Sequence, residues 1–82
     1  MTPAKYVILK SATGVEHAVI FPAGLNHSDV VSNRNQAVAA GFFFSAQGSV
    51  YVIEGMSSIS LCLSPRPQDQ ELIARTISEA TI

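Results

Sequence analysis

Short apolar segments, rich in β-branched and aromatic residues, recur along the chain and predict β-strands. They are residues 5–10, 16–21, 37–46 and 49–54. Small residues, glycine or proline separate them, as in residues 11–14, in residues 22–24 and in the two-residue turn Gln47-Gly48. Because such turns reverse the chain, the first two and the last two of these strands are expected to form antiparallel hairpins.

Residues 57–63 predict a fifth strand. Ile59, Leu61 and Leu63 alternate there with two serines and a cysteine. Strict alternation is typical of a strand in a sheet with one covered face.

Residues 67–79 predict a C-terminal helix. Pro67 suits the first helical position, and Asp69 and Glu71 lie near the positive end of the helix. An apolar stripe follows, made of Leu72, Ile73, Ile77 and Ala80. We expect this stripe to cover the sheet against the apolar side of residues 57–63.

The 82 residues are enough for one core, so residues 1–82 are expected to form a single domain. The element order predicts an α+β fold. About five mostly antiparallel strands would form a curved sheet or small open barrel, with the C-terminal helix packed on it.

The composition favours protein partners over nucleic acid, either further copies of this chain or another protein. The apolar fraction is 48% and the charged fraction 13%, about half of the usual charged share. A small domain cannot hide so much apolar surface, which favours a homo-oligomer, with a dimer preferred. Five basic residues are spread along a chain of net charge −1, a pattern unfavourable for phosphate binding.

The chain also gives an expectation about its location. No segment reaches the ~18 consecutive apolar residues that span a bilayer, and the first residues lack the pattern of a signal peptide. The single cysteine, Cys62, cannot form an internal disulfide. We therefore expect a cytoplasmic protein, in the host cytoplasm if the chain is phage-encoded, without a membrane partner.

The sequence offers little for catalysis. His17, His27 and Cys62 are isolated from one another, so neither a metal site nor a cofactor is expected. No glycine-rich phosphate loop occurs. Although His27, Ser28 and Asp29 are contiguous, we interpret them as a polar loop in which Ser28 caps one helical turn. The protein is therefore expected not to be an enzyme.

Two features favour protein binding instead. Three adjacent phenylalanines, residues 42–44, cannot all face one side of a strand, so at least one must meet a second apolar surface. The small residues before them, 39–41, allow close approach of another backbone. Residues 24–36 form the most polar connection. The predicted protein-binding residues are Phe42, Phe44, His27, Asp29, Asn33 and Arg34.

One resemblance bears on origin. The strand-like run that starts at Gly55-Met56-Ser57 leads into the turn Ser64-Pro65-Arg66-Pro67 and a short terminal helix. Residues 52–73 thereby resemble the C-terminal half of small hypothetical proteins of tailed bacteriophages and prophages. The opening residues 5–9 and Phe21-Pro22 are also similar to theirs. The resemblance implies a phage-encoded origin, but it implies no particular activity for this chain.

Together these features suggest a non-enzymatic phage or prophage accessory protein. It would act by protein–protein binding, as a homo-oligomer, and occlude or bridge a host or phage protein. Two alternatives stay open. One is a structural component of a virion or other assembly. The other is a small enzyme or ligand-binding subunit whose site forms between chains and uses His27 and Asp29.

Overall fold

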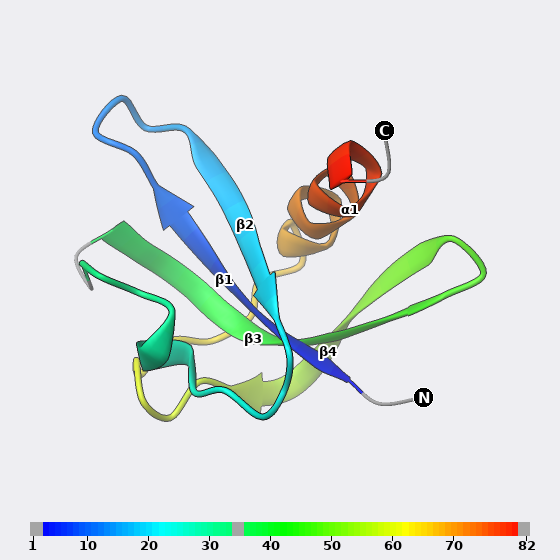
Figure 1. Cartoon of the computed structure of the whole chain (residues 1–82), viewed down its shortest axis with the longest axis horizontal. Helices are drawn as coiled ribbons and strands as arrows, with labels where there is room; N and C mark the ends of the chain where they lie inside the picture. The colour runs from blue at the N-terminus through cyan, green and yellow to red at the C-terminus, as the bar shows by residue number, and fades with distance from the viewer. Residues whose placement is uncertain (1–2, 34–35, 81–82) are drawn as a thin grey trace.

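The computed structural model describes residues 3–33 and 36–80 and has an α+β fold (Figure 1). The strands are β1 (Ala4–Lys10), β2 (Glu16–Phe21), β3 (Ala37–Ala46) and β4 (Ser49–Ser57). They form one antiparallel sheet in the order β2-β1-β3-β4. A 3₁₀ turn, η1 (His27–Asp29), lies between β2 and β3, and helix α1 (Asp69–Ala80) ends the chain. The α+β class and the C-terminal helix are confirmed.

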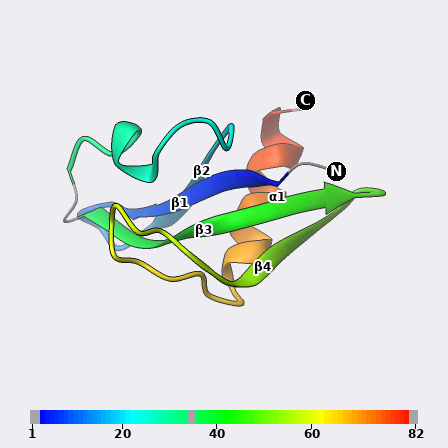
Figure 2. The same cartoon turned by 90° about the horizontal axis from the view of Figure 1, so that it is seen from below.

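The β3–β4 hairpin has the predicted two-residue turn. Gln47 and Gly48 have φ angles of 53° and 82°, the left-handed pair that a tight hairpin requires. This turn sets the register, so Phe44 lies opposite Tyr51. The tip of the hairpin projects beyond the rest of the sheet in two perpendicular views (Figures 1 and 2).

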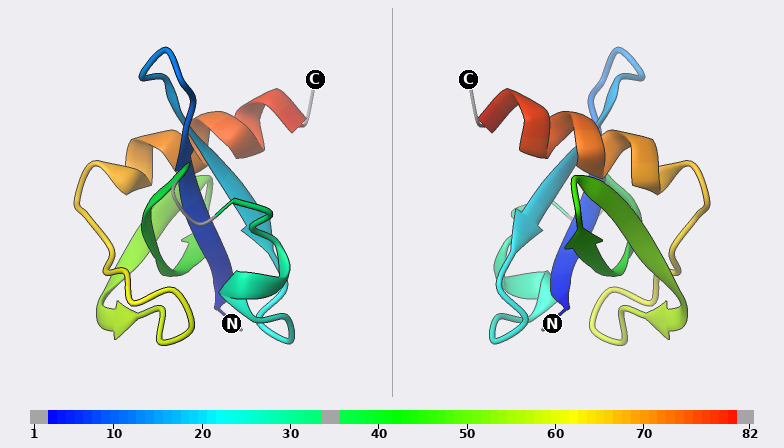
Figure 3. Two further views of the ribbon diagram at one scale, coloured as in Figure 1. Left: turned by 90° about the vertical axis from the view of Figure 1, so that its left-hand side faces the viewer. Right: turned by 90° about the vertical axis from the view of Figure 1, so that its right-hand side faces the viewer.

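Each face of the sheet carries a buried apolar cluster. On one face, α1 crosses the strands (Figure 3), with Leu72, Ile73 and Ile77 packed on the sheet. The cluster on this face contains Tyr6, Ile8, Ala18, Ala39, Phe43 and Ile73. The other face holds a second cluster of Val7, Phe21, Ala40 and Leu61. The alternation of side chains along β1 divides the core in this way.

The predicted fifth strand is wrong. Beyond Ser57 the chain makes a tight turn that is closed by an antiparallel bridge between Ser58 and Leu63. Cys62 has a φ of 57°, and Ile59, expected in the core, is 94% exposed. Leu61 and Leu63 belong to the second cluster, on the face opposite α1. The predicted packing of the helix against these residues is therefore also wrong. Ala80, the last residue of the predicted stripe, is not among the residues whose side chains the structure describes.

The small residues of β3 allow a close backbone approach, as predicted. A Cβ atom at Gly41 would lie 3.1 Å from the carbonyl oxygen of Met56 and 3.1 Å from the Cβ of Pro65. Glycine therefore lets the end of β4 and the segment before α1 pass close to β3.

Helix α1 begins with a reciprocal cap. The backbone N–H of Asp69 donates to the carbonyl oxygen of Arg66 (3.0 Å), and the N–H of Arg66 donates to Asp69 Oδ2 (2.8 Å). This arrangement satisfies backbone groups at the start of the helix. The helix therefore begins at Asp69, two residues after the predicted start at Pro67.

Side chains of α1 also reach both edge strands. Gln70 Oε1 accepts a hydrogen bond from the N–H of Val52 in β4 (3.0 Å). The hydroxyl of Thr76 lies 3.3 Å from the carbonyl oxygen of Ala18 in β2. Because edge strands with free backbone groups pair readily with other chains, these contacts reduce strand addition at both edges.

Candidate protein-binding site

Aromatic side chains gather on β3 and β4, on the face opposite α1. Phe43 points toward α1 and is buried, so its neighbours Phe42 and Phe44 point to the other face. The rings of Phe44 and Tyr51 stack, with centroids 5.2 Å apart and planes 26° apart. Phe44 is 36% exposed and Tyr51 44% exposed. We call Phe42, Phe44 and Tyr51 the aromatic face.

Phe42 is held at the inner end of the aromatic face. Lys5 lies opposite it on β1, with its Nζ 5.5 Å from the centroid of the Phe42 ring. The same Nζ donates a hydrogen bond to the carbonyl oxygen of Leu25 (2.7 Å). The lysine therefore covers one end of the face and is itself fixed by the loop after β2.

His27 lies beneath Phe42 rather than on the surface. Its side chain is buried, and its Nε2–H donates to the carbonyl oxygen of Gly41 (2.9 Å). Its ring meets Phe42 and Phe21 edge-on, with centroids 5.6 and 5.5 Å away. Burial lowers the pKa of His27 below its ordinary value, which keeps the imidazole neutral. His27 therefore anchors η1 to the sheet and supports Phe42.

The other predicted loop residues have separate places. Asp29 Oδ2 accepts the backbone N–H of Asn26 (3.0 Å), so its carboxylate closes its own turn. Asn26 is the N-cap of η1, and the predicted cap at Ser28 is wrong. Asn33 is exposed, and its carbonyl oxygen accepts the N–H of Gln36 (3.1 Å). Arg34 lies outside the described residues.

The sequence interpretation missed Tyr51. Its signal was the two-residue turn at Gln47-Gly48, because counting outward from this turn places Tyr51 opposite Phe44. The structure therefore adds Tyr51 to the predicted phenylalanines, as the cross-strand partner of Phe44 in an exposed aromatic pair.

A buried polar network lies on the other side of the sheet. The side chain of Asp69 is fully buried, and its Oδ2 accepts the hydroxyl of Tyr6 (2.6 Å). Arg66 donates from Nε to Asp69 Oδ1 (2.9 Å) and from Nη2 to Glu16 Oε1 (2.8 Å). Burial, and then the hydrogen bond to Asp69, raise the pKa of Tyr6. The hydrogen bond from Arg66 lowers the pKa of Glu16.

This network joins β1, β2 and the start of α1. All buried side-chain nitrogen and oxygen atoms of the described residues have hydrogen-bond partners. A network in which every member is satisfied stabilises one arrangement of the elements. We therefore assign Tyr6, Glu16, Arg66 and Asp69 a structural role.

Other classes of site gain no support from the geometry. Across residues 3–33 and 36–80, no three histidine, cysteine or acidic side chains group as metal ligands. In the same part of the chain, no helix has the length and apolar character needed to cross a membrane. No protein-family model, curated protein or solved structure matches this chain.

Proposed function

We propose that this protein is a non-enzymatic protein-binding module that acts as a homodimer, with the aromatic face as the contact between two copies. The stacked and exposed Phe44–Tyr51 pair on the projecting hairpin carries this proposal. Aromatic side chains supply much of the binding energy at protein interfaces, because they remove a large area from water at a small cost in conformational entropy.

The charge pattern favours a second copy as the occupant. Residues 36–53, which span β3 and the first five of the nine residues of β4, contain no aspartate, glutamate, lysine or arginine. The Phe44–Tyr51 ends of two copies therefore meet without like-charge repulsion, and a two-fold axis places each aromatic pair against the same surface of its partner. A typical contact of about 800 Å² per partner would cover roughly a sixth of the 5131 Å² surface.

The biological role stays a prediction that rests on the resemblance of residues 52–73. As a phage or prophage accessory protein, the dimer would present two copies of the polar connection between β2 and β3. It would use them to occlude or bridge a host or phage protein in the cytoplasm. Self-association would also suit a structural component of an assembly. That role requires oligomers larger than a dimer, whereas the accessory role requires the dimer only.

Light scattering after size exclusion, across roughly a hundredfold range of protein concentration, tests the dimer. We expect a mass of about twice the 8.7 kDa of one chain over most of this range. A mass of one chain at every concentration would contradict the proposal. A mass that grows steadily beyond the dimer would favour the structural component instead.

A further inference from the structure

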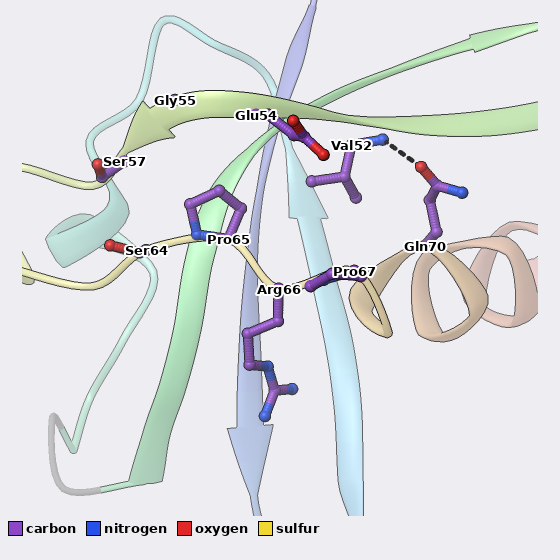
Figure 4. Close-up of a pocket in the computed structure, with 9 residues that line it drawn as sticks. All are labelled: Val52, Glu54, Gly55, Ser57, Ser64, Pro65, Arg66, Pro67 and Gln70. Carbon is purple, nitrogen blue, oxygen red and sulfur yellow. Dashed lines mark hydrogen bonds between the residues drawn. The ribbon is translucent and has the colours of Figure 1, made fainter.

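A cleft separates β4 from the segment that leads into α1 (Figure 4). Its volume is about 450 Å³, and it is open to solvent. Val52, Pro65 and Pro67 give it apolar walls, and Ser57 and Ser64 lie at one end. The cleft follows the outer edge of β4, whereas the aromatic face lies on the broad side of the hairpin.

Glu54 brings a free negative charge to this cleft. Its carboxylate points into the space between β4 and the segment containing Pro65 (Figure 4). Within the described part of the chain, no lysine or arginine forms an ion pair with Glu54. Arg66 lines the cleft, but its guanidinium extends away from β4 toward Glu16 and Asp69, which neutralise it.

The remaining electrostatics also favour a cation. The start of α1 lies at the cleft and carries a partial positive charge of about half a unit. The ion-paired group of Arg66, Glu16 and Asp69 next to it carries one net negative charge, which outweighs this partial charge. The hydroxyls of Ser57 and Ser64 add neutral acceptors at the end of the cleft.

We propose that this cleft binds the side chain of a lysine or arginine from a partner protein. The alkyl stem would lie on Val52 and the two prolines, and the cationic group would pair with Glu54. Long basic side chains bury their stems and keep their charged ends hydrated, so an open cleft with one carboxylate suits them. The proposal does not depend on the homodimer, because none of the three residues of the aromatic face lines the cleft.

Two matched probes test the site by amide chemical shifts in NMR spectra. Nα-acetyl-lysine methylamide carries the cation, and Nα-acetyl-norleucine methylamide has a similar stem without it. We expect saturable shifts of Gly55, Ser57 and Gln70 with the lysine probe. Because an exposed ion pair contributes up to ~1 kcal/mol, binding of the norleucine probe should be about fivefold weaker.

Variants locate the contact. Glu54→Gln is expected to weaken lysine-probe binding by about fivefold, and since Glu54 is exposed the rest of the spectrum should keep its pattern. Glu79→Gln, an exposed carboxylate in the last turn of α1, is the matched control and should bind like the parent. Added salt should weaken binding of the lysine probe but not of the norleucine probe. Equal binding of both probes, unchanged binding by Glu54→Gln, or no saturable shift would each overturn the proposal.

Discussion

Replacing Asp69 with alanine is expected to remove roughly half of the free energy of unfolding of the protein. The carboxylate is fully buried and accepts hydrogen bonds from Tyr6 and Arg66. Its removal leaves the buried hydroxyl of Tyr6 and part of the guanidinium of Arg66 without hydrogen-bond partners, at a cost of about 3–5 kcal/mol. A domain of 82 residues has a total stability of roughly 4–12 kcal/mol. Urea denaturation followed by circular dichroism measures the loss.

Glu71→Ala is the matched control for this experiment. Glu71 occupies the same turn of α1, but it is exposed, and its carboxylate lies 3.8 Å from Arg75. Exposed pairs of this kind contribute less than about 1 kcal/mol, so the urea midpoint should hardly change. If Asp69→Ala were as stable as Glu71→Ala, the buried network would not be what holds α1 to the sheet.

Replacing Phe44 with serine is expected to convert the proposed dimer into a monomer. In a two-fold symmetric contact each substitution acts twice, so the loss of two central rings costs about 4 kcal/mol. This corresponds to a rise of about a thousandfold in the dissociation constant. Sedimentation equilibrium at several protein concentrations measures the change.

The fold of the single chain should survive this substitution, because the ring of Phe44 packs on Tyr51 at the surface and not in either core cluster. Val15→Ser provides the control. Val15 is 63% exposed in the turn between β1 and β2, away from the aromatic face. Equal dissociation constants for the two variants would show that the aromatic face is not the contact.

The strands and hairpins were predictable because their signals are local. Alternation and turn residues defined β1, β2 and β3 within one residue, and Gln47-Gly48 predicted the turn before β4. Helix α1 was predicted two residues too early, because the reciprocal hydrogen bonds of Arg66 and Asp69 set its first turn.

Residues 57–63 show where a local pattern misleads. Their alternation fits a strand, but Ser58 Oγ accepts the N–H of Leu61, and the chain turns back at once. Serine side chains compete in this way with sheet hydrogen bonds. The turn also uses a left-handed conformation at Cys62, a residue type that gives no turn signal.

The candidate site was predictable in part. The crowding of three phenylalanines indicated that two faces of β3 are apolar, and the structure places Phe42 and Phe44 on one face. The places of His27 and Asp29 were not predictable, because they depend on tertiary contacts. One is the bond from His27 to Gly41, fourteen residues away. The buried network of Tyr6 and Asp69 likewise joins residues 63 positions apart.

The most direct test of the proposed homodimer is an isotope-filtered nuclear Overhauser experiment on a mixture of labelled and unlabelled protein. Only contacts between two copies give signals in this experiment. We expect signals from the ring protons of Phe44 and Tyr51 to the uncharged residues of β3 and β4 in the other copy. An absence of signals between copies, or signals confined to surfaces away from these rings, would contradict the proposal.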